Sequence, residues 1–181
     1  MKGEITEQAG AKEPHAAVAI ILRSGQEGPE VLLIQRATRE GDPWSGQMAF
    51  PGGRSESQDN GLHETAVRET AEEVGDRLAE SMELLGRLDD LEAIARGRKT
   101  GLTISPFVYW LDKDVSLAPS PAEVAEVFWT PVTPLLRGDA DSTHLYRHNG
   151  VPMRLPAYLV QGKSVWGLTY KMLAGFLERL R

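Results

Sequence analysis

Apolar residues recur along this chain in short runs separated by turn residues, and the pattern predicts strands over much of its length. Most of these runs are rich in valine, isoleucine or leucine, and they are bounded by glycine, proline or charged residues. Asn149-Gly150 separates two such runs and predicts a β-hairpin with a two-residue turn. The predicted strands cover residues 15–24, 30–37, 82–88, 102–111, 124–129, 143–147 and 151–159.

Apolar positions spaced by three and four residues predict two helices. The first runs from about Asn60 to Gly75, and its N-cap candidates are Asp59, Asn60 and Gly61. The second begins at or just after Trp166 and continues towards the C-terminus. The chain has no internal repeat and no long low-complexity segment. Together these features predict an α/β fold, with a mixed sheet enclosed by helices.

Composition and charge agree with one soluble enzyme domain. An apolar content of 41% with 25% charged residues is ordinary for a globular protein. We expect a single domain over 15–181, preceded by a flexible extension over 1–14 that lacks the apolar core of a signal peptide. The apolar run 16–22 is too short to span a bilayer, so no membrane partner is expected. The absence of cysteine fits a reducing cytoplasm, and a net charge of −6 argues against a nucleic-acid partner.

Three glutamates lie on one edge of the first predicted helix. Glu69, Glu72 and Glu73 stand at i, i+3 and i+4, so their side chains converge. Like charges at this spacing destabilise a helix by a few tenths of a kcal/mol per pair, so the arrangement indicates a counter-charge. A hard cation that prefers oxygen ligands, Mg²⁺ or Mn²⁺, would supply it.

The Gly52-Gly53 pair supports the metal-site interpretation. Glycine lets the backbone turn tightly and bring a bare carbonyl or amide close to a metal or a phosphate. The alternative is that the acids form the solvated face of an ordinary amphipathic helix, and the helix alone does not decide between the two. The glycine pair at this distance from the acids favours the metal site.

The segment FPGGRSESQDNGLHETAVRETAEEVG resembles the signature of the Nudix (MutT-type) hydrolases, G-x5-E-x7-R-E-U-x-E-E-x-G-U, in which U is apolar. The resemblance extends from about residue 16 to the C-terminal helix and implies an α/β/α sandwich with a mixed sheet. It also implies that Glu69, Glu72 and Glu73 bind the metal, together with the carbonyl group of Gly53. Arg68 would support the acidic cluster through a charge-assisted pair.

The chain departs from this signature in its loop. Counting back from the Arg-Glu pair, the first glutamate of the signature falls on Asn60 and its first glycine on Arg54. The loop is therefore one residue longer, and Asp59 is the expected substitute for that glutamate. Thr70 and Asp76 occupy the two apolar positions.

The resemblance implies hydrolysis of a diphosphate, and the charges agree with it. Such a reaction needs charge neutralisation on the phosphate and a positioned water, which a metal held by the glutamates would provide. Glu72 and Glu73 are therefore candidate catalytic residues. The family commonly recruits a further carboxylate from a distant loop, and the candidates for it are Glu123 and Glu126, although Glu126 can equally stand at the end of a strand.

The substrate is predicted from a further resemblance. The stretches LLIQRATREGDPWSGQMAFPGG, ISPFVYWL, EVAEVFWTPV and SVWGLTYKML resemble the coenzyme A diphosphatase branch of the family. Ala37, Trp44 and Gly46 depart from the pattern of that branch. Coenzyme A is thus the leading substrate, and the alternatives are ADP-ribose, NADH, a nucleotide sugar or a nucleoside triphosphate. A nucleotide sensor without catalysis and an RNA-end processing enzyme are alternatives from other classes.

Three residues around the glycine loop are candidates for substrate binding. Arg36 and Arg54 would donate hydrogen bonds to phosphates, although surface arginines are often only solvated. Trp44 either stacks on an adenine ring or packs its loop onto the domain. The sequence leaves the oligomeric state open, a homodimer included.

Overall fold

The computed structural model describes residues 14–95 and 98–181, and within these ranges the chain forms two sheets and four helices. The predicted flexible extension over 1–14 lies outside the described residues, apart from Pro14. The larger sheet has eight strands among the described residues, and all of its pairs are antiparallel except that of β1 with β7. These strands are β1 (His15–Gly25), β2 (Gly28–Arg36), β3 (Met48–Ala49), β4 (Gly52–Arg54), β5 (Met82–Arg87), β6 (Leu91–Ala95), β7 (Arg98–Leu111) and β8 (Val124–Pro131).

Strand β1 lies in the middle of this sheet and is buried on both faces. Val18 and Ile20 belong to one core, while Ala19 and Ile21 point to the opposite face and belong to a second core. Along one of its edges β1 pairs in parallel with β7, from His15 opposite Thr103 to Arg23 opposite Leu111. Because neither face meets water, the strand is apolar almost throughout instead of alternating with polar residues.

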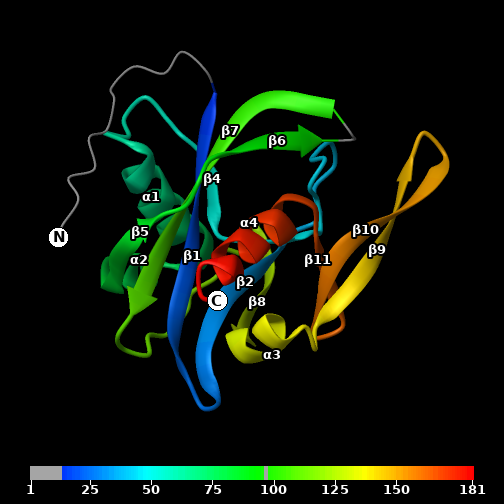
Figure 1. The fold of residues 1–181 in the computed structure, drawn as a ribbon. Helices are drawn as coiled ribbons and strands as arrows, with labels where there is room; N and C mark the ends of the chain where they lie inside the picture. Colours follow the sequence, from blue (N-terminus) through cyan, green and yellow to red (C-terminus); the bar gives the residue numbers. More distant parts are fainter. Residues whose placement is uncertain (1–13, 96–97) are drawn as a thin grey trace.

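Helices cover both faces of the large sheet, as Figure 1 shows. Helices α1 (Leu62–Val74) and α2 (Asp76–Ser81) contribute to one core. Helices α3 (Val132–Arg137) and α4 (Gly167–Glu178) contribute to the other. The predicted α/β/α sandwich with a mixed sheet is therefore confirmed. The prediction of only two helices was wrong, because α2 and α3 are too short for an apolar period to be visible.

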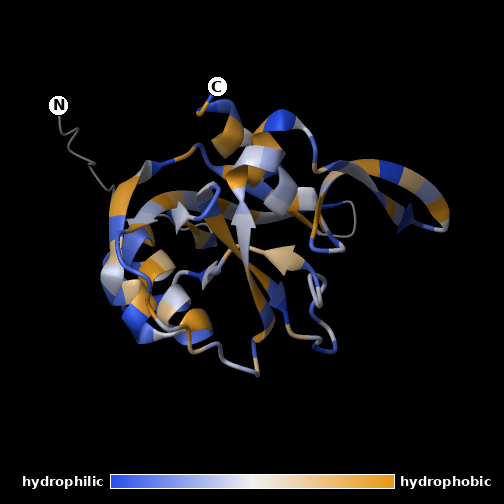
Figure 2. Cartoon of the chain, turned by 90° about the horizontal axis from the view of Figure 1, so that it is seen from below, coloured by the Kyte–Doolittle hydropathy of each residue, from blue (hydrophilic) through white to orange (hydrophobic). Residues whose placement is uncertain are grey.

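A second sheet contains the predicted hairpin. It consists of β9 (Asp141–His148), β10 (Val151–Val160) and β11 (Lys163–Trp166), in the order β11-β10-β9. Asn149 and Gly150 have φ angles of 49° and 81°, so the two-residue turn is confirmed. Figure 2 shows the hairpin projecting from the body of the protein, with apolar and polar residues alternating along it. Neither β11 nor β6 was predicted from the sequence.

The glycine loop fills a gap between β1 and β2. The two strands pair only over Leu22–Gly25 of β1, and further back β1 pairs with β4 instead. The N–H group of Ala19 donates to the carbonyl of Pro51 at 2.8 Å. A Cβ atom on Gly52 would lie 2.3 Å from the carbonyl oxygen of Ala17, and the φ of Gly52 is 150°. Only glycine permits this approach, and it places the loop beside Glu69 and Glu73 in the second half of α1.

Candidate active site

The start of α1 is organised around Asp59. Of the three N-cap candidates, Gly61 occupies the position, and it provides no side-chain cap. The carboxylate of Asp59 instead accepts a hydrogen bond from the hydroxyl of Thr65 at 2.8 Å and one from the N–H of Glu56 at 2.9 Å. Asp59 is therefore directed at the helix and its own loop.

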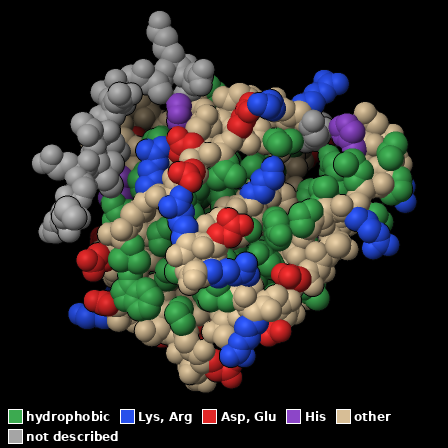
Figure 3. Space-filling view, viewed as in Figure 1, with side chains coloured by type: hydrophobic (Ala, Val, Ile, Leu, Met, Phe, Trp, Pro, Cys, Tyr) green, Lys and Arg blue, Asp and Glu red, His purple; other side chains and the backbone are tan. Residues whose placement is uncertain are grey.

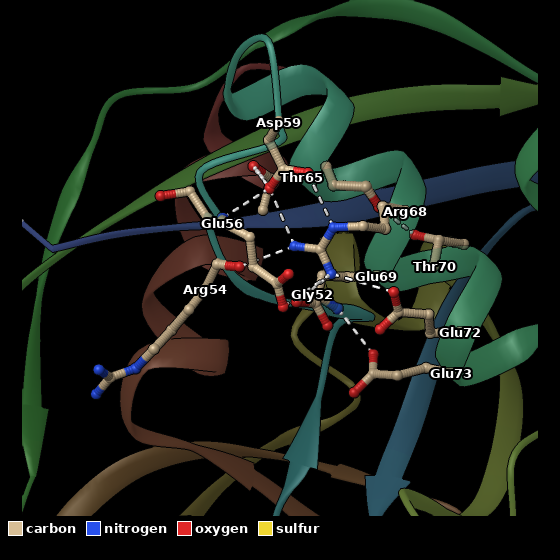
Figure 4. A network of polar contacts seen from close by, with 12 residues as sticks. Gly52, Arg54, Glu56, Asp59, Thr65, Arg68, Glu69, Thr70, Glu72 and Glu73 are labelled. Atoms are coloured by element: carbon tan, nitrogen blue, oxygen red, sulfur yellow. Dashed lines mark hydrogen bonds and ion pairs between the residues drawn. The ribbon is translucent and has the colours of Figure 1, made fainter. Parts of the chain in front are cut away.

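Arg68 joins this loop to the acids of the helix (Figure 4). Its Nε and Nη2 donate to the two carboxylate oxygens of Asp59 at 2.9 and 3.0 Å. Its Nη1 donates to Glu69 at 3.0 Å and to Glu72 at 3.2 Å, and Nη2 also donates to the carbonyl of Arg54 at 2.9 Å. These hydrogen bonds lower the pKa of Asp59 to about 2 and raise the pKa of Arg68.

Glu73 is the most deeply buried of the three acids. Its side chain is 3% exposed, and its Oε2 accepts a hydrogen bond from the N–H of Gly52 at 2.8 Å. Burial raises the pKa of Glu73 to about 7, with Glu69 and Glu123 adding to the effect and Arg36 opposing it. A buried carboxylate among other carboxylates is a group that a cation would stabilise.

Glu69 lies against the second glycine of the loop. A Cβ atom on Gly53 would lie 2.4 Å from the carboxyl carbon of Glu69, so any larger residue would push this carboxylate out of its observed position. Burial also raises the pKa of Glu69, against the lowering effect of Arg68. The absence of a side chain at Gly53 thus permits the observed position of the Glu69 carboxylate.

The donor set fits a hard divalent cation, because it offers carboxylate oxygens beside a glycine backbone. The described residues nevertheless contain no group of three acids or histidines already arranged to hold an ion. The reason lies in the hydrogen bonds: Arg68 holds Glu69 and Glu72, while Glu73 turns to the N–H of Gly52. A cation bound at this site would therefore compete with a guanidinium group for Glu69 and Glu72.

A cavity of about 840 Å³ connects the acids with the rest of the predicted site. Glu69, Glu73 and Gly53 line it, whereas Glu72 does not and its side chain is 52% exposed. The three predicted substrate residues also line the cavity. The remaining walls come from the hairpin, from the start of α4 and from β6 and β7. The structure thus brings together residues that are far apart in sequence.

The three predicted substrate residues differ in their surroundings. Arg36 donates to Asp42 at 2.7 Å and lies 4.0 Å from Glu73, and its buried Nε has no hydrogen-bond partner among the described residues. Trp44 is partly buried, and its backbone N–H donates a hydrogen bond to the carboxylate of Asp42 at 2.9 Å. The side chain of Arg54 points away from the acids (Figure 4).

The two candidates for the distant carboxylate are separated by the structure. Glu123 lines the cavity. The backbone carbonyl of Glu123 accepts a hydrogen bond from the N–H of Ala37 at 2.7 Å, which holds its loop against the domain. Arg39 lies 3.7 Å from its carboxylate. Glu126 does not line the cavity and instead pairs with Lys163 at 3.3 Å. The geometry therefore favours Glu123.

The sequence did not reveal the contribution of the hairpin. Tyr146, His148 and Trp166 line the cavity although nothing in the motif singled them out. Their alternation places Tyr146 and His148 on one face of β9. That alternation is visible in the sequence. Whether this face of β9 points into the cavity or into solvent depends on how the hairpin packs against the larger sheet.

Comparison with known proteins identifies the family. Residues 13–148, which include the glycine loop and α1, match the NUDIX domain. The chain belongs to the Nudix family of diphosphohydrolases, enzymes that act on phosphoric anhydrides and generally use divalent metal ions. Among the described helices, none is long and apolar enough to cross a membrane.

The relatives cover different shares of this Nudix chain. A Schizosaccharomyces pombe protein is 42% identical over 110 residues, which are 60% of this chain and 33% of that protein. The chain thus spans about a third of the length of this relative. Human mitochondrial coenzyme A diphosphatase NUDT8 is 33% identical over 167 residues, which are 91% of this chain and 68% of that protein.

A solved structure supports the fold. The NUDIX domain of Shewanella oneidensis NrtR, crystallised with ADP ribose, has a TM-score of 0.62 with 17% identity, and the match covers 96% of this chain and 92% of that one. At this identity the likeness concerns the fold alone.

Proposed function

We propose that this Nudix protein hydrolyses the diphosphate linkage of coenzyme A to phosphopantetheine and adenosine bisphosphate, with Mg²⁺ or Mn²⁺. The observation that carries the proposal is the similarity to a coenzyme A diphosphatase over 91% of the chain. The loop and strand segments that resemble the same branch lie within this match. A cytoplasmic location and a homodimer stay predictions.

Glu69, Glu72, Glu73 and the carbonyl of Gly53 are the residues that would hold the metal. When bound, the ion neutralises charge on the diphosphate and lowers the pKa of a water molecule. Arg68 donates hydrogen bonds to Glu69 and Glu72 and so fixes the orientation of these two carboxylates. It also binds Asp59 and thereby holds the loop before α1. Its role is that of a positioning residue.

Arg36 is the proposed phosphate-binding residue. Its Nη2 is fixed by Asp42, and its buried Nε has no partner among the described residues. A buried N–H group is costly when it is unpaired, so a phosphate oxygen that enters beside Arg36 is a suitable acceptor for it. Its Nη1 lies only 4.0 Å from Glu73, so a phosphate bound by Arg36 would lie beside the acids.

Glu123 is the proposed general base that receives a proton from the attacking water. Its side chain is 38% exposed and borders the same cavity as Glu69 and Glu73. Arg39 donates to the carbonyl of Ala122 at 2.6 Å and thereby holds the loop in place. Deletion of this carboxylate should lower kcat more than it raises KM.

A panel of diphosphates tests the proposal. Purified protein is incubated with magnesium chloride and, in turn, coenzyme A, NADH, ADP-ribose, a nucleotide sugar and a nucleoside triphosphate, and the products are identified by mass. Coenzyme A should have the highest kcat/KM and yield phosphopantetheine. If another compound is hydrolysed rapidly and coenzyme A is not, coenzyme A is rejected as the substrate, whereas the diphosphohydrolase activity of the family is retained. Inertness of the whole panel with Mg²⁺ and Mn²⁺ would favour the sensor alternative.

A further inference from the structure

The β9–β10 hairpin carries a row of rings on one face. His144, Tyr146 and His148 alternate along β9 onto this face, and Trp166 joins it from β11. The rings of His144 and Trp166 stack with their centroids 4.2 Å apart and their planes 9° from parallel. The ring of Tyr146 lies 5.4 Å from that of Trp166. We call these four side chains the hairpin ring row.

The hairpin ring row borders the same cavity as the acids. Tyr146, His148 and Trp166 line this cavity, as do Glu69 and Glu73. In Figure 3 hydrophobic and histidine side chains gather over the hairpin at the right of the view. A substrate whose diphosphate lies at the acids can therefore extend along the cavity to the rings.

Tyr146 and His148 are neighbours at the outer end of the row. Their centroids are 6.4 Å apart and their planes are 24° from parallel. A planar ring in van der Waals contact with two others needs about 7 Å between them, because carbon atoms pack at about 3.5 Å. Both side chains are only partly buried, and a base that stacks between them would have to widen their spacing slightly.

We propose that the hairpin ring row is the nucleobase subsite, in which the base of the substrate stacks on Tyr146 and His148 while its diphosphate lies at Glu69 and Glu73. The inference rests on the proposed function only in requiring a nucleoside diphosphate derivative, and it does not require coenzyme A. Stacking on a ring tolerates different bases, so the row recognises a planar base, and the other walls of the cavity discriminate the rest of the substrate. The base-stacking role thereby moves from Trp44 to the hairpin.

Binding of adenosine 5′-monophosphate tests this subsite without turnover, because this nucleotide contains no phosphoric anhydride. Its affinity is measured by calorimetry in magnesium chloride and compared with that of ribose 5-phosphate, which lacks the base. The wild type should bind the nucleotide about tenfold or more tightly, as one stacked base provides. Tyr146→Leu and His148→Ala should each remove most of that difference. Leu145→Ala is the matched control, because Leu145 lies on the opposite face of the same strand and is 57% exposed.

Three results would overturn the subsite: equal affinity of the wild type for the two ligands, unchanged nucleotide affinity in both ring variants, or loss of the nucleotide preference in Trp44→Ala alone. Tyr146→Phe keeps the ring and should retain the affinity, which separates stacking from loss of fold. Base-dependent binding in a protein that leaves coenzyme A intact would reject the proposed substrate and support the subsite.

Discussion

Arg68 holds Asp59 with two parallel hydrogen bonds, from Nε to Oδ1 at 2.9 Å and from Nη2 to Oδ2 at 3.0 Å. The carboxylate of Asp59 is 3% exposed, so this pair is sheltered from water. The remaining nitrogen of the same guanidinium, Nη1, donates to Glu69 and Glu72. One side chain therefore connects the loop before α1 with the acids on the helix.

Arg68→Ala should destabilise the protein by about 3 kcal/mol, because it leaves the carboxylate of Asp59 buried without its partner. Turnover should fall as well, since Glu69 and Glu72 lose their positioning. Chemical denaturation and steady-state kinetics measure the two effects. Arg179→Ala is the control: its pair with Asp89 is largely exposed and should contribute less than about 1 kcal/mol. Wild-type stability and rate in Arg68→Ala would make that residue a bystander.

Asp59→Asn should show a pH-dependent loss of stability. The pKa of Asp59 is lowered from 3.8 to about 2 in the folded protein, so its charged form stabilises the fold above pH 3.8 and the contribution disappears as the pH falls through 2. The shift corresponds to about 2 kcal/mol at neutral pH. The stability difference between wild type and variant should shrink to roughly half by pH 3. Urea unfolding at pH 7, 4 and 3 measures it, and a constant difference would contradict the assignment.

Glu73→Gln should lower kcat by about 100-fold or more without unfolding the protein, because the amide has the same shape and is a much poorer metal ligand. The amide oxygen can still accept the N–H of Gly52. Burial disfavours the charge of Glu73, so the melting temperature should not fall. A chelator should abolish the wild-type activity. Full activity of Glu73→Gln, or of the wild type in chelator, would refute the site.

The two glycines of the loop should respond differently to alanine. Gly52→Ala places a Cβ against the backbone of Ala17 and Val18, at a φ of 150°, and should destabilise the fold. Gly53→Ala places a Cβ against the flexible carboxylate of Glu69, and should weaken metal binding while the protein stays folded. Thermal melting and Mn²⁺ binding separate the two outcomes. Equal melting temperatures for both variants would contradict the close packing at Gly52.

Trp44→Ala should raise KM for coenzyme A more than it lowers kcat, since Trp44 lines the cavity and is not among the acids. Trp110→Phe is the control, because Trp110 does not line the cavity. Steady-state kinetics with both variants provide the test. A fall in kcat at unchanged KM would place Trp44 in the chemical step instead.

The sequence predicted those parts of the fold whose signals are local. The apolar period of α1 and the positions of Glu69, Glu72 and Glu73 on one edge follow from helical geometry. The Asn149-Gly150 dipeptide specifies its hairpin turn because both residues accept positive φ angles. The six-residue helices α2 and α3 complete fewer than two turns, so they carry no readable period.

The walls of the cavity depend on contacts that no local pattern encodes. Trp44 and Tyr146 belong to a loop and a hairpin that are far apart in sequence, and only the packed fold brings them around one cavity. Asp59 was expected to replace a glutamate of the motif, and the structure directs its carboxylate to Arg68 and Thr65. The proposal of Glu123 over Glu126 likewise needed the position of their loop.

The parallel pairing of β1 with β7 also has a consequence for the order in which the protein folds. His15 pairs with Thr103 and Arg23 with Leu111. The central strand β1 therefore cannot complete its pairing until β7, which lies much later in the sequence, has been synthesised. Closing so long a loop is slow, and it comes after local pairing such as that of β1 with β2. Until β7 arrives, one edge of an apolar strand is unprotected, so a truncated chain that ends before Thr103 is expected to aggregate.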